Sequence, residues 1–218
     1  SNNGIRLSSS SNNAVTGNTC NDNNYYGIAL YSSSNNTVTG NICHNNRSYG
    51  IYLSSSSNNT VTGNTCNNNS DGIHLYSSSN NNTVTGNTCN DNNGNGIHLH
   101  SSSKNTITGN TSNSNYTGIH LVFSSNNNTI TGNTCHNNRN EGISLSSSSN
   151  NTVTGNTCIR GTGQTSDYAS DQYTIQLQNI SNYNLIAINN CMGKAVVIDG
   201  GTGNSAWGNK FDNTNDLS

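Results

Sequence analysis

The chain has 218 residues, of which 28% are hydrophobic and 7% are charged, and it contains no proline. Ordinary domains contain about 45–50% apolar and about 25% charged residues, so a conventional globular core is not expected. The formal net charge is -2 and only 7 residues are Lys or Arg, which argues against nucleic-acid binding because no basic stripe is available for phosphate contacts.

A strict repeat runs through the first part of the chain. Asn- and Ser-rich text is otherwise typical of disordered or aggregation-prone segments. Here the apolar residue of each phrase like TVTGN recurs every 23 residues, and a Cys, or Ser112 in its place, follows it at a constant distance. The apolar positions are Val15, Val38, Val61, Val84, Ile107, Ile130 and Val153. A period of this kind is typical of a stacked repeat architecture.

A Gly-Ile-x-Leu phrase supplies a second apolar pair in each repeat. In the repeats of Ile73 and Ile119, one residue is lost before the Ile and one is gained after the Leu, so the repeat keeps its length. Alternation in both phrases has period two, which is typical of strands with Val, Ile and Leu facing inward. Scarce Ala, Glu and Lys exclude helical repeats, and a period of 23 is not a multiple of six or nine. We predict an all-β solenoid with about 23 residues and three short strands per coil.

Residues 58–75, which read NNTVTGNTCNNNSDGIHL, resemble the repeats of NosD-like proteins and of archaeal cell-surface β-helix proteins. The resemblance implies a single-stranded right-handed parallel β-helix. It is strong over residues 1–158 and weaker beyond them. We therefore interpret 1–218 as a single β-helix domain with regular coils 1–158, an insertion 159–174, divergent coils 175–211 and a tail 212–218. NosD-like proteins are linked to copper-site assembly, but no copper motif carries over residue by residue.

Asn residues are expected to support the bends of this β-helix. Val38 and Cys43 point inward in one coil, and Asn41 lies at the bend between them. Side-chain hydrogen bonds between equivalent Asn residues would satisfy the backbone of the turn. The expected ladder contains Asn18, Asn41, Asn64, Asn87, Asn110, Asn133 and Asn156.

The inward Cys column has two interpretations. Cys residues of neighbouring coils would lie about 4.7–4.9 Å apart, within the range of a disulfide. The pairs would then be Cys20–Cys43, Cys66–Cys89 and Cys135–Cys158. The interpretation we favour is that the thiols are reduced and fill the core as small apolar groups. Metal ligation by this column is not expected, because side chains stacked inward offer no tetrahedral geometry.

The outward position of the Gly-Ile-x-Leu phrase carries rings in consecutive coils. With the positions just beyond the Leu, it supplies the candidate ligand-binding residues Tyr52, His74, Tyr76, His98, His100 and His120. Such an exposed patch could bind a divalent transition metal or stack against sugar rings. Imidazoles spaced one coil apart rarely converge on one ion, so we predict no metal site and no cofactor. No acid is evident within reach of these rings, so we predict no catalytic residue there.

The insertion 159–174 is the longest departure from the repeat. A long loop on an otherwise regular stack is a favourable place for a lid or a contact surface. Asp167 and Asp171 lie within it and are further candidate binding residues. They also raise the alternative of a catalytic carboxylate pair of the kind that glycosidases use.

We interpret the chain as a non-catalytic extracellular or cell-surface module, a structural spacer or adhesion element that can also bind carbohydrate. Alternatives are a polysaccharide-active enzyme of the β-helix type and an ice-binding protein that uses Thr-x-Thr ranks such as Thr83 and Thr85. Expected partners are glycans or neighbouring surface proteins, and no apolar run reaches the roughly 18 residues of a membrane span. Because the first strand begins half way through a coil, we also expect end-to-end association or a longer parent chain.

Overall fold

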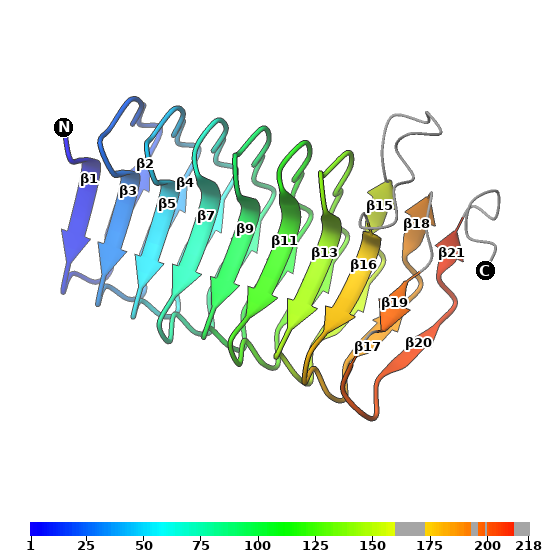
Figure 1. Cartoon of the computed structure of the whole chain (residues 1–218). Helices are drawn as coiled ribbons and strands as arrows, with labels where there is room; N and C mark the ends of the chain where they lie inside the picture. Colours follow the sequence, from blue (N-terminus) through cyan, green and yellow to red (C-terminus); the bar gives the residue numbers. More distant parts are fainter. Residues whose placement is uncertain (160–172, 193–195, 199, 212–218) are drawn as a thin grey trace.

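The computed structural model describes residues 1–159, 173–192, 196–198 and 200–211. Parallel strands stack along one axis, with the N-terminus at one end of the stack and the last described strand at the other (Figure 1). This is the predicted parallel β-helix. Among the described residues, no helix is long and apolar enough to cross a membrane.

Two nine-stranded parallel sheets form the long faces of the solenoid. The front sheet consists of β1 (Asn3–Ser8), β3 (Tyr26–Tyr31), β5 (Tyr49–Ser54), β7 (Asp71–Tyr76), β9 (Asn95–His100), β11 (Thr117–Val122), β13 (Glu141–Ser146), β16 (Tyr173–Gln178) and β19 (Val197–Ile198). The rear sheet consists of β2 (Ala14–Thr16), β4 (Thr37–Thr39), β6 (Thr60–Thr62), β8 (Thr83–Thr85), β10 (Thr106–Thr108), β12 (Thr129–Thr131), β14 (Thr152–Thr154), β17 (Leu185–Ala187) and β20 (Ser205–Trp207).

The third side of the coil is shorter than the other two. In the earlier coils it is one bridged residue per coil, as in the pairs Thr19↔Ile42 and Ile42↔Thr65. Within the described part of the chain, it lengthens into strands only at β15 (Thr157–Ile159), β18 (Asn190–Met192) and β21 (Lys210–Phe211). The prediction of three strands therefore holds for the later coils. The backbone bends at Asn41 and again at Asn46, at the two ends of this side of the coil. Because the two bends are close in sequence, little length remains for a strand between them.

The core is a set of apolar columns that run along the solenoid axis. Register pairs Ile51 with Ile73 and Leu53 with Leu75 in the front sheet, and Val61 with Val84 in the rear sheet. All of these side chains are fully buried, as the period-two alternation predicted. Burying one such side chain stabilises a fold by about 1.5–3 kcal/mol, so repetition of the columns supplies the hydrophobic stabilisation that composition alone did not suggest.

Buried Asn residues hold the bends together, as predicted for the column of Asn41. Asn64 Nδ2 donates to the carbonyl oxygens of Val38 (2.9 Å) and Thr62 (3.1 Å) and to Asn87 Oδ1 (2.9 Å). Its backbone N–H donates to the same Asn87 oxygen. Two further Asn ladders and a Ser ladder close other corners and were not predicted: Asn36, Asn59, Asn82 and Asn105; Asn46, Asn69 and Asn92; and Ser33, Ser56 and Ser79.

The seven cysteines are buried and free, which agrees with the favoured interpretation of reduced thiols. Burial raises the pKa of the Cys66 thiol well above its ordinary value, and hydrogen bonds to the neighbouring thiols act in the same direction. A thiol in this position remains neutral and packs as a small apolar side chain.

Candidate functional site

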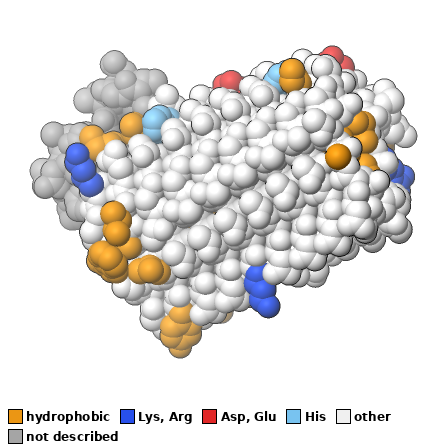
Figure 2. Space-filling model, turned by 180° about the vertical axis from the view of Figure 1, so that it is seen from behind, with side chains coloured by type: hydrophobic (Ala, Val, Ile, Leu, Met, Phe, Trp, Pro, Cys, Tyr) orange, Lys and Arg blue, Asp and Glu red, His pale blue; other side chains and the backbone are white. Residues whose placement is uncertain are grey.

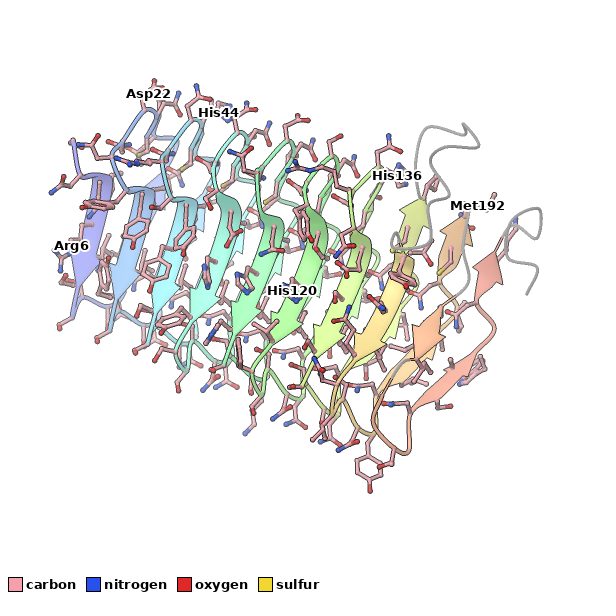
Figure 3. The ribbon with its side chains drawn as sticks, viewed as in Figure 1. Arg6, Asp22, His44, His120, His136 and Met192 are labelled. Carbon is pink, nitrogen blue, oxygen red and sulfur yellow. The ribbon has the colours of Figure 1, made fainter. Side chains whose placement is uncertain are left out.

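The outer face of the front sheet carries three columns of side chains, set by the parallel register. The middle column aligns Tyr52, His74, His98 and His120 on successive strands. The column at the strand ends contains Tyr76 and His100, and the column at the strand starts contains Tyr49 and Asp71. Figure 3 shows His120 on this face and His44 and His136 at the loop edge. The structure therefore brings together the six ring residues that the sequence singled out.

Aromatic and imidazole rings on this face form two continuous rows across five coils. In the first row neighbouring ring centroids are 4.3–5.4 Å apart, and its members are Tyr26, Tyr49, His74, His98 and His120. In the second row they are 4.7–6.3 Å apart, and its members are Tyr31, Tyr52, Tyr76, His100 and Phe123. We call these ten residues the ring face.

The ring face is less exposed than the expected open ladder of side chains. Tyr52 is 9% exposed and His74 is 5% exposed, although both point away from the core. Neighbouring rings cover them, since the stacked and edge-on contacts lie on both sides of each side chain. Tyr76 and Phe123, which are 38% and 62% exposed, present the open surface of the second row.

The carboxylate of Asp71 contacts the imidazoles of His74 and His98. The prediction that no acid lies near these rings is therefore wrong. Its Oδ2 atom is 3.3 Å from His74 Nδ1 and 3.1 Å from His98 Nδ1. Its other oxygen accepts hydrogen bonds from Asn95, at 2.7 Å from the backbone nitrogen and 3.2 Å from Nδ2. The signal in the sequence is the residue lost before Ile73, which moves Asp71 into the register position of Tyr49.

Opposing effects determine the pKa values within the Asp71 cluster. Burial raises the pKa of the Asp71 carboxyl, but the hydrogen bonds and charges of His74 and His98 outweigh burial and hold it well below its usual range. Burial lowers the pKa of His74, and the contact with Asp71 opposes this effect. At neutral pH the cluster is therefore a carboxylate beside a buried neutral imidazole at His74.

His120 makes the stability of this face sensitive to pH. Burial and the charge of His98 lower its pKa from 6.5 to about 4. Between these values the unfolded chain binds a proton that the folded chain does not, so stability falls as pH drops from about 6.5 toward 4. We expect His120→Gln to reduce this loss, measured by urea denaturation over a series of pH values. Equal slopes for the variant and the wild-type protein would contradict this prediction.

A second buried acid, Glu141, lies at the start of β13 on the same face. Thr117 Oγ1 donates to it at 2.7 Å and Asn140 Nδ2 at 2.8 Å, and burial raises its pKa. Sequence reasoning missed its burial because Glu141 reads as a loop residue. The candidate residues Asp167 and Asp171 lie outside the described residues, so their place relative to this face stays a prediction.

The outer face of the rear sheet carries mainly uncharged polar side chains (Figure 2). Thr residues of the rear sheet align in register, as in Thr60↔Thr83 and Thr62↔Thr85. Figure 2, viewed from behind, shows mostly uncharged polar surface with few charged side chains. Ice binding by these ranks stays a prediction.

The stacked parallel strands and the ring face define the chain as a parallel β-helix protein with a ring-lined outer sheet. It belongs to the NosD family, whose model, described as periplasmic copper-binding protein (NosD), matches residues 1–111 and 77–218. A search of the curated proteins found no match.

Solved structures share the fold at low sequence identity. The A-module of the mannuronan C-5 epimerase AlgE6 from Azotobacter vinelandii is 17% identical with a TM-score of 0.78, over 93% of this chain and 58% of that one. The periplasmic alginate epimerase AlgG is 23% identical with a TM-score of 0.67, over 85% and 47%. An alginate lyase from a Paenibacillus species is 14% identical with a TM-score of 0.56, over 94% and 97%. The chain thus spans about half the length of the epimerases.

Proposed function

We propose that this protein is a non-catalytic carbohydrate-binding module of the cell envelope or the extracellular space, and that an extended glycan lies along the ring face. The observation that carries the proposal is the pair of unbroken ring rows across five coils. At the usual spacing of about 4.7–4.9 Å between strands, the rows extend about 19 Å, long enough for several sugar residues. The family description and the name of AlgG support an envelope location.

The chemistry of the rings suits a sugar chain. Aromatic faces pack on the apolar faces of sugars, while imidazole nitrogens and phenol groups hydrogen-bond to hydroxyls. A pocket adjoins the N-terminal end of the ring face and is lined by Asn2, Asn24, Tyr25, Arg47 and Ser48. The ring of Tyr25 in this pocket lies 6.1 Å from the ring of Tyr26 in the ring face. The Arg47 guanidinium of the pocket could pair with the carboxylate of an acidic sugar.

The spacing of Asp71 and Glu141 argues against glycoside hydrolysis by this pair of acids. Asp71 and Glu141 begin strands that are three strand spacings apart in the front sheet. At about 4.7–4.9 Å per spacing, these carboxylates are separated by about 14 Å. Glycoside hydrolysis uses pairs about 5–9.5 Å apart. Asp71 Oδ1 also accepts hydrogen bonds from Asn95, and Glu141 accepts one from Thr117.

The test is a glycan array, followed by calorimetry with soluble acidic and neutral polysaccharides. We expect the wild-type protein to bind, and we expect the double variant Tyr76→Ala, Phe123→Ala to lose at least about tenfold in affinity, because each exposed ring contributes about 0.5–1.5 kcal/mol beyond the area it buries. Tyr183, which is 64% exposed and lies outside the ring face, is the matched control as Tyr183→Ala. No binding by the wild-type protein, or equal binding by the double variant, would refute the proposal.

A further inference from the structure

Three donor atoms meet on the outer face of the front sheet. They are Asp71 Oδ2, His74 Nδ1 and His98 Nδ1, and all lie within 4.8 Å of one another. The carboxylate oxygen is 3.3 Å from the first nitrogen and 3.1 Å from the second. A tetrahedral ion bound at about 2.0–2.2 Å holds its ligand atoms about 3.3–3.6 Å apart. The two separations from the carboxylate oxygen are therefore close to those around a bound ion, and the two nitrogens lie within 4.8 Å of each other.

The two imidazoles share a single carboxylate oxygen, and their other ring nitrogens have no hydrogen-bond partner. His74 is 5% exposed, its Nε2 atom is buried without a hydrogen-bond partner, and its Nδ1 atom faces Asp71 Oδ2 at 3.3 Å. His98 Nε2 is also buried without a partner. Buried polar atoms with incomplete hydrogen bonding destabilise a fold. Ring stacking alone does not explain why both Nδ1 atoms are directed at one carboxylate oxygen. An ion bound between Asp71 Oδ2 and the two Nδ1 atoms would use all three of these atoms as ligands.

The carboxylate is held in place by a neighbouring coil. Asn95 donates to Asp71 Oδ1 from both its backbone and its side chain, which leaves Oδ2 facing the imidazoles. Gly94 provides the space, since a Cβ at that position would lie 2.5 Å from Asp71 Oδ1. Outer contacts of this kind orient ligands in metal sites and raise their affinity.

We propose that Asp71, His74 and His98 bind one divalent transition-metal ion of the Zn²⁺ or Cu²⁺ class, with a remaining coordination position for water. Two imidazole nitrogens and a carboxylate oxygen suit these ions, and Cu²⁺ binds such sites more tightly than Zn²⁺. The metal named in the family description therefore fits this donor set. In-line imidazoles converge here because the shortened loop before β7 brings Asp71 against both of them. This site does not depend on glycan binding.

The test is calorimetric titration of the untagged full chain with Zn²⁺ and with Cu²⁺. We expect one equivalent to bind, and we expect Asp71→Asn and His98→Ala each to weaken binding by at least about tenfold. Gly94→Ala removes no ligand but displaces the carboxylate, so it should weaken binding as well. His136→Ala, at the loop edge, is the matched control and should bind as the wild-type protein does.

A spectroscopic measurement separates this site from adventitious binding. Electron paramagnetic resonance of the Cu²⁺ complex should show coupling to two imidazole nitrogens in the wild-type protein and to one in His98→Ala. If His98→Ala fails to fold, the nearly isosteric Asp71→Asn still decides the question. The proposal is overturned if the wild-type protein binds neither ion, or if Asp71→Asn retains wild-type affinity.

Discussion

Replacing Asn87 by alanine should lower the free energy of unfolding by about 3–5 kcal/mol, because several buried groups would lose their partners together. Asn87 Nδ2 donates to the carbonyl oxygens of Val61 and Thr85 and to Asn110 Oδ1, at 2.9, 3.1 and 3.0 Å. Its Oδ1 accepts from the backbone and side chain of Asn64. Alanine would leave these buried groups without their hydrogen-bond partners. Urea denaturation at equilibrium measures the loss.

Asn93→Ala is the matched control for this substitution. Asn93 lies in the following loop with its side chain exposed, so its replacement should change stability by no more than about 0.5 kcal/mol. Hydrogen exchange should locate the effect of Asn87→Ala in the coils on either side of it, since each coil of a solenoid contacts mainly its neighbours. Equal stability of the two variants would mean that the Asn ladder contributes little.

Replacing Gly72 by alanine should destabilise the protein by about 3 kcal/mol, at the upper end of the usual range for overpacking. A Cβ at this position would lie 2.6 Å from the carbonyl oxygen of Gly96 and 2.8 Å from Cys89 Cβ. Both belong to the next coil, so neither can move without opening the stack. The expected loss of stability therefore comes from the lack of space between coils. Thermal and urea denaturation measure this loss.

Gly63→Asn separates this effect from the general cost of losing a glycine. Gly63 has a φ of +62°, and a Cβ there would meet nothing within 4 Å. Asn tolerates this left-handed conformation better than other residues, so the variant should lose no more than about 1 kcal/mol. A Gly72→Ala variant as stable as Gly63→Asn would show that neighbouring coils can separate at little cost.

The period of 23 residues and the two-residue alternation determined the fold, the inward columns and the ladder of Asn41. These features follow from the sequence because a stack of equal coils places equivalent residues above one another, and alternation decides which of them face inward. The further ladders at Asn36 and Asn46 recur with the same period, and their burial could have been inferred from it.

The contact of Asp71 with His74 and His98, and the burial of Tyr52 and His74 on an outward face, were decided only by the tertiary structure. Each depends on lateral neighbours one coil away, and on how a one-residue shift at the start of β7 redirects a side chain. A periodic sequence specifies which residues share a column. How closely adjacent columns approach, and which side chains thereby lose water, depends on the direction of each side chain and on the packing of the rings between coils.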